Sequence, residues 1–244
     1  MNIVQNSQKV YKILAESHQS LRGAGPPLIG KPDQDQIESA HWSLKQVSIF
    51  TSYTWFNGSG GQGQSFGLVS NSTKHDKFSV VTCLEILVQE IISIMPDVDT
   101  IKFFSDGAAS QFKNRFLLQH LTTMMEETGV EFEWNYFASS HGKGVVDGIG
   151  GTLKRLVWME NMAGMRCSSA RDFVDICNQK TKTIIVGMVQ QAQFDTTEAL
   201  LVDTFKVIPG LPEIQKQHHI KVLHKDVIEY DKYSTSTDKH VFKF

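Results

Sequence analysis

One stretch of the chain constrains its fold more than any other, because apolar runs and amphipathic segments alternate between residues 100 and 158. Residues 100–105 and 130–138 are apolar or alternate in polarity, as strands do, whereas residues 110–128 and 145–158 repeat apolar side chains every three or four positions, as helices do. The pattern predicts a strand, a helix, a strand and a helix in succession. Such a succession is typical of an α/β sheet rather than of an all-helical or all-β domain.

The segments on either side continue this alternation. Residues 46–55 and 65–70 are rich in β-branched and aromatic side chains and flank the turn NGSGGQGQ, which predicts a β-hairpin. Residues 79–95 repeat apolar side chains at helical spacing up to Pro96, where we expect the helix to end. The remaining predicted elements are a helix over 169–178, a strand over 183–189 and a strand over 219–223. This order predicts an α/β fold with helices on both faces of a mixed sheet.

The two ends of the chain differ from this central part. Val10, Tyr11 and Leu14 recur at helical spacing near the N-terminus, and a stretch rich in glycine and proline follows them. We therefore predict an N-terminal helix and linker over residues 1–33, an α/β domain over 34–192 and a C-terminal extension with short strands over 193–244.

Composition limits the class of protein. With 244 residues, of which 41% are hydrophobic and 20% charged, the chain can bury one large core. Its longest apolar stretches are too short or too polar to span a bilayer, and no secretory signal is recognisable, so we expect an intracellular protein without a membrane partner. The three cysteines show no CxxC spacing, which favours buried reduced thiols. Because the net charge is −2, nucleic-acid binding would require a local basic patch.

Two aspartates hold the positions that most favour chemistry. Asp106 follows the predicted strand 100–105, and α/β sheets bind ligands at the carboxyl ends of their strands. Asp147 lies in the predicted helix 145–158, on the side opposite its apolar stripe. We expect both carboxylates to face one polar site, where two hard oxygen ligands without a Cys/His set suit Mg²⁺ or Mn²⁺. A structural alternative for Asp106 is to cap the helix that follows.

Glycines and cations surround Asp147. The loop SSHGKG precedes a helix N-terminus, which favours anions, but its spacing does not match a nucleotide-binding P-loop. The pair Gly150-Gly151 costs about 1 kcal/mol per residue relative to alanine, which indicates close approach by a ligand or by another element, such as a packed helix. We predict a phosphate-binding or nucleic-acid-binding patch, with ordinary solvated charges as the alternative. Its members are His141, Lys143, Lys154, Arg155 and Lys113.

Three motifs carry a resemblance to a known group. The stretches QDQIESAHWS, FFSDGAASQFKNR and SSHGKGVVDGIGGTLKR resemble animal proteins associated with the RNase H-like, retroviral-integrase-like superfamily of DDE/DDD transposases, over about residues 34–190. In that fold one Asp lies on the first, central strand, a second ends the fourth strand, and a third acid lies on a later helix. The resemblance implies that Asp106 is the second acid and Asp147 the third, and that Lys154 is a helix cation that meets DNA.

The chain departs from this group before the motif SAHW. Those relatives carry a strand of the form Asp-Phe-(Ala/Ser)-Glu-Asn there, where this chain has RGAGPPLIGKPDQ, and neither Asp33 nor Asp35 replaces its aspartate. We therefore expect an RNase H-like sheet that is incomplete at its N-terminal strand. The leading hypothesis is a transposase-derived domain, ancestrally a Mg²⁺-dependent DNA phosphodiester nuclease or strand transferase, nuclear if it acts on DNA. The alternatives are a catalytically dead nucleic-acid-binding or interaction module, and a gene fragment without a stable fold.

Overall fold

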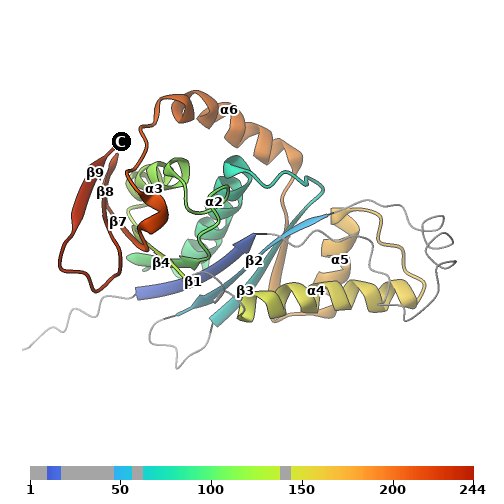
Figure 1. Cartoon of the computed structure of the whole chain (residues 1–244). Coiled ribbons are helices and arrows are strands. Elements are labelled where there is room, and N and C mark those ends of the chain that lie inside the picture. Colours follow the sequence, from blue (N-terminus) through green and yellow to red (C-terminus); the bar gives the residue numbers. More distant parts are fainter. Residues whose placement is uncertain (1–9, 18–46, 57–62, 138–143) are drawn as a thin grey trace, which may run out of the picture.

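A single mixed sheet organises the protein (Figure 1). The computed structural model describes the backbone of residues 10–17 and all of residues 47–56, 63–137 and 144–244. Nine strands pair in the order β6-β3-β2-β1-β4-β5-β7-β8-β9. They are β1 (Val10–Ser17), β2 (Ser48–Trp55), β3 (Gly63–Ser70), β4 (Thr100–Ser105), β5 (Glu131–Tyr136), β6 (Ile184–Met188), β7 (His219–His224), β8 (Val227–Asp231) and β9 (His240–Lys243). Helices lie on both faces, which confirms the predicted α/β class.

The first strand corrects two expectations. Residues Val10–Ser17 form β1 rather than a helix, and β1 lies within the sheet, antiparallel to β2 and parallel to β4. Backbone pairing along both edges outweighs the helical spacing of a few apolar side chains, which is a weak signal in so short a segment. The prediction of a sheet without its N-terminal strand is therefore wrong. The rest of the predicted N-terminal helix and linker lies outside the described residues.

Two helices cover one face of the sheet. α2 (Lys77–Ile94) begins at Asp76, whose carboxylate accepts the N–H of Ser79 at 3.0 Å. α3 (Arg115–Thr128) begins at Asn114, whose side-chain oxygen accepts the N–H of Leu117 at 3.0 Å, and ends at Gly129 with a φ of 71°. The predicted helix over 110–128 therefore starts later than expected, because the side chain that caps it is Asn114.

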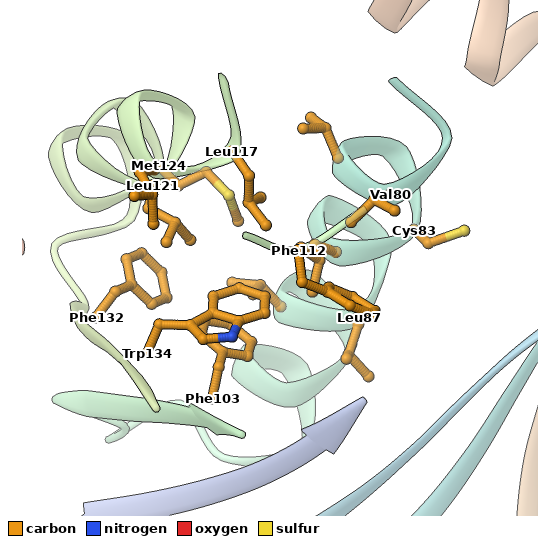
Figure 2. Close-up of a cluster of buried hydrophobic side chains, with 14 of the residues drawn as sticks. Val80, Cys83, Leu87, Phe103, Phe112, Leu117, Leu121, Met124, Phe132 and Trp134 are labelled. Atoms are coloured by element: carbon orange, nitrogen blue, oxygen red, sulfur yellow. The ribbon is translucent and has the colours of Figure 1, made fainter. Parts of the chain in front are cut away.

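The main core lies between these helices and the sheet. Figure 2 shows Phe103, Phe132 and Trp134 beneath the side chains of α2 and α3. The rings of Phe103 and Trp134 stack with centroids 4.6 Å apart, and both side chains are fully buried. Such packed aromatic pairs stabilise a core beyond the effect of their buried area. This core fixes the carboxyl ends of β4 and β5.

The opposite face carries α4 (Val145–Met162) and α5 (Ala170–Lys180), which lie over β2, β3 and β6 (Figure 1). α4 comes so close to β3 that a Cβ atom at Gly67 would lie 2.6 Å from Cδ1 of Leu153. Glycine in β3 therefore permits the close approach of α4. Ser169 caps α5 by accepting the N–H of Asp172 at 3.2 Å.

The C-terminal residues continue the same structure. α6 (Gln191–Val207), which was not predicted, packs on α2, and a short 3₁₀ turn, η1 (Ile214–Lys216), leads into β7. β7 pairs antiparallel with β5, and β8 and β9 follow in antiparallel order. The predicted short strands of residues 193–244 are therefore present, and they extend the main sheet.

Candidate functional site

Several strands end at one edge of the sheet. β4 and β5 run parallel to β1, and β3, which is separated from β1 by the antiparallel β2, runs in the same direction and pairs parallel with β6. Their carboxyl ends therefore share one edge, the usual location of ligand sites in α/β sheets. Asp106 follows β4 at this edge.

Asp106 is exposed and belongs to a tight turn. Its Oδ1 atom accepts the N–H of Ala108 at 3.1 Å. The preceding Ser105 donates its hydroxyl to the carbonyl oxygen of Asp106 at 2.8 Å and accepts the indole N–H of Trp134 at 2.9 Å. Asp106 does not cap α3, because Asn114 does so, and the structural alternative considered for it is wrong in that form. The core thus holds the end of β4 in place while the carboxylate stays accessible.

Asp147 lies in the first turn of α4 and is half-buried. Its Oδ2 atom accepts the N–H of Gly144 at 3.2 Å, so the carboxylate satisfies a backbone donor at the start of the helix, although Gly144 has no side chain to complete a capping box. A negative charge at this end also interacts favourably with the helix dipole. Asp147 therefore has a structural role of its own, and a site shared with Asp106 stays a prediction.

The described residues do not fit a catalytic metal centre. Among them no group of three or more His, Cys, Asp and Glu side chains is placed to hold a metal ion. The carboxylates of Asp106 and Asp147 each accept a backbone N–H. β1, with the sequence VYKILAES, contains no aspartate. Asp106 and Asp147 supply two of the three acids that the resemblance to DDE/DDD transposases implies.

Lys113 does not lie on a surface patch. Its side chain is buried, its Nζ atom donates to the carbonyl oxygen of Gln215 at 2.8 Å, and it lies 5.0 Å from the ring centre of Tyr136. Burial lowers the pKa of its ammonium group. This environment argues against the predicted phosphate contact. Lys113 instead ties the segment after Asp106 to the C-terminal part of the chain.

The outward face of α4 presents cations beside bare helix backbone. Arg155 is exposed and Lys154 is half-buried, with its ammonium pKa lowered by burial. Gly148 and Gly151 are exposed, and a Cβ atom at either would meet no described heavy atom within 4 Å. The expectation that Gly151 accommodates a neighbouring element is therefore wrong within the described part of the chain. The loop residues His141 and Lys143 lie outside that part.

A buried network of charged side chains was not predicted from the sequence. His219 on β7 is buried, with Nδ1 3.1 Å from Oδ2 of Asp231 and Nε2 3.8 Å from Oε2 of Glu133. The same Glu133 oxygen lies 2.7 Å from Nζ of Lys102. Glu133 and Asp231 raise the pKa of His219, and the interactions of Glu133 with His219 and Lys102 lower the pKa of the Glu133 carboxyl to about 2. The alternating polarity of β5 hinted at a polar face, but its partners come from distant strands.

Comparison with known proteins gives a family. Residues 32–234 match the model of a family described as a domain of unknown function, DUF8701. The chain belongs to this family. β1 precedes the matched range, so the family match begins after this interior strand of the sheet. No curated protein and no solved structure matches the chain. Within the described residues of this DUF8701 member, no helix is long and apolar enough to cross a membrane.

Proposed function

We propose that this DUF8701 member is a transposase-derived, RNase H-like domain that binds DNA along α4 and does not cleave it. The observation that carries the proposal is the outward face of α4, where Lys154 and Arg155 stand beside the open surface of Gly148 and Gly151. Because glycine has no side chain, a helix face with glycines at its centre lets the sugar-phosphate backbone of DNA approach closely. Cations beside it supply the charge that phosphates need.

The order of the elements supports the ancestry. The resemblance implies a first, central strand, an acid after the fourth strand and another acid on a later helix. In this chain β1 lies inside the sheet beside β4, which is the fourth strand, and Asp106 follows β4. Asp147 lies on α4, which follows β5. β1, Asp106 and Asp147 therefore hold positions that the resemblance implies, although β1 lacks the aspartate of the first strand.

The local excess of positive charge supports DNA as the ligand. Residues 144–183, which include α4 and α5, contain six Lys and Arg but four Asp and Glu, whereas the whole chain has a net charge of −2. Arg155, Arg166 and Arg171 are exposed, and none of them forms an ion pair within the described residues, unlike Lys180, which pairs with Glu160 at 2.8 Å. Unpaired cations on one layer attract a polyanion and release its counter-ions on contact.

The acidic residues support DNA binding without DNA cleavage. β1 brings no aspartate to the sheet, and the described carboxylates do not assemble into a metal site. Phosphodiester cleavage by paired metal ions requires both ions to be held about 4 Å apart by shared ligands. DNA binding by this protein should therefore weaken as the salt concentration rises and should not require Mg²⁺. DNA binding would place it in the nucleus.

Fluorescence anisotropy with a labelled DNA duplex tests this binding. The variant Lys154→Gln/Arg155→Gln should reduce the slope of log affinity against log salt by about 1.8, because each phosphate contact contributes about 0.9. The matched control is Lys232→Gln/Lys243→Gln, which removes two exposed cations from the C-terminal strands and should leave the slope unchanged. Equal slopes for wild type and both variants would refute the proposal.

A nicking assay tests the second candidate, an active nuclease. One observation favours it, because continuing the β1–β4 register beyond the pair Leu14–Phe104 by two residues brings Glu16 level with Asp106. Supercoiled DNA with Mn²⁺ should stay intact if the domain only binds. Nicking that disappears in both Glu16→Gln and Asp106→Asn would establish the enzyme instead.

A further inference from the structure

A groove between α2 and α6, apolar over most of its surface, has no role in the proposed function. It is lined by Thr82, Glu85 and Ile86 of α2 and by Ala192, Gln193, Thr196 and Thr197 of α6, and its volume is about 320 Å³. That volume is at the lower end of the range for small-molecule sites. The two helices belong to the layer on the face of the sheet opposite α4. Anything bound here is therefore independent of DNA on α4.

A hydrogen bond with a side chain of α3 orients the Glu85 carboxylate. Its Oε1 atom lies 2.9 Å from Nε2 of His120, a side chain on α3 that is only 5% exposed, whereas the Glu85 side chain is 41% exposed. The Nδ1 atom of His120 is buried and has no hydrogen-bond partner. A proton on Nδ1 would be a buried donor without an acceptor, so we assign the single imidazole proton to Nε2, which donates it to Glu85.

This assignment leaves the Glu85 carboxylate charged and without a compensating cation. The neutral imidazole orients the carboxylate but brings no positive charge. Among the described residues no lysine or arginine forms an ion pair with Glu85, although Lys74 pairs with the nearby Glu198 at 3.4 Å. A fixed, partly desolvated anion therefore faces the groove.

The groove also offers a hydroxyl acceptor. Thr196 donates its hydroxyl hydrogen to the carbonyl oxygen of Ala192 at 2.8 Å and is exposed, so its oxygen keeps lone pairs that can accept a hydrogen bond from a ligand. The hydroxyl of Thr82 is bonded to the carbonyl oxygen of Phe78 at 2.9 Å and is buried. Ile86 and Ala192 add apolar surface between these polar groups.

We infer that the groove between α2 and α6 binds a primary alkylammonium group, with the Glu85 carboxylate as its counter-ion. An ammonium group has three donors and no acceptor, which complements the Glu85 carboxylate and the exposed Thr196 hydroxyl, while its alkyl chain suits the apolar surface of the groove. Mg²⁺ fits less well, because it is usually held by carboxylates in strict octahedral geometry and this groove has one. The ammonium belongs to a free polyamine or to a lysine side chain of a partner protein.

Calorimetric titration of the full chain with 1,5-pentanediamine tests the inference. The diamine should bind saturably with a dissociation constant of about 1 mM, and Glu85→Gln should weaken it at least about tenfold, since a charge-assisted hydrogen bond is lost. Glu90→Gln is the matched control, because Glu90 is an exposed acid on the same helix outside the groove. A thermal melt of each variant checks that the fold is intact.

Two further ligands complete the experiment. The neutral alcohol 1-pentanol should not bind, and Nα-acetyl-lysinamide should bind more tightly than the diamine if the natural occupant is a protein lysine, and less tightly if it is a free polyamine. Equal binding of pentanol and diamine, an unchanged affinity in Glu85→Gln, or no saturation up to about 50 mM diamine would each overturn the inference. None of these outcomes bears on DNA binding by α4.

Discussion

The buried histidine on β7 allows a sharp test of how the C-terminal strands are held. His219 lies between the carboxylates of Asp231 on β8 and Glu133 on β5, and the Asp231 side chain is 0% exposed. Together with Lys102 the network has two positive and two negative charges only when the imidazole is protonated. We expect His219→Gln to destabilise the protein and to remove part of its pH dependence.

The magnitude follows from the geometry. Removing one partner from a buried charge pair costs about 3–5 kcal/mol, and the glutamine amide can restore one neutral hydrogen bond of about 1 kcal/mol, so the expected loss is about 3 kcal/mol. The two carboxylates raise the pKa of His219 above its value of 6.5 in the unfolded chain. Its stabilising effect is therefore complete below pH 6.5 and is lost as the pH rises through the pKa of the folded state.

Urea unfolding at several pH values between about 5.5 and 9 measures the effect, with His224→Gln as the control. His224 lies on the same strand but is exposed, so its variant should follow the wild type. The difference in unfolding free energy between wild type and His219→Gln should be largest at acid pH and shrink towards pH 9. A difference that is absent at acid pH, or that stays constant across the range, would refute the charged state assigned to His219.

Three further outcomes follow from the packing. Gly67→Ala should destabilise the fold by about 1–3 kcal/mol in thermal melts, because its Cβ would lie 2.6 Å from Leu153, and the penalty should fall in a Leu153→Ala background; an equal penalty in both would contradict this contact. Gly151→Ala should instead stabilise α4 by up to about 1 kcal/mol, because its methyl group meets open space, while weakening DNA binding; a loss of stability would show that the position is not open. With a thiol reagent under native conditions Cys167 should react first, because the other two cysteines are buried and burial raises their thiol pKa to about 12; equal rates would contradict the structure.

The candidate site shows where sequence reasoning reaches its limit. The position of Asp106 after a buried strand and that of Asp147 in the first turn of a helix followed from local periodicity, and both were predicted correctly. Whether a lysine near them faces solvent depends on what packs over it. Lys113 is buried because Gln215, about a hundred residues later, supplies a carbonyl acceptor. No local pattern around Lys113 contains that information.

The sequence by itself determined most of the regular elements, because a helix satisfies its hydrogen bonds within one segment and its apolar stripe is visible locally. For this reason α2, α4 and α5 could be predicted from the spacing of their apolar residues. Tertiary structure alone decided the state of residues 10–17, since this strand is held by backbone pairing to β2 on one side and to β4 on the other. It also decided that Glu133 of β5 lies against His219, which in turn contacts Asp231. Pairing between strands that are distant in sequence is a property of the whole sheet. It determines both the place of β1 and the contacts of the buried charged side chains.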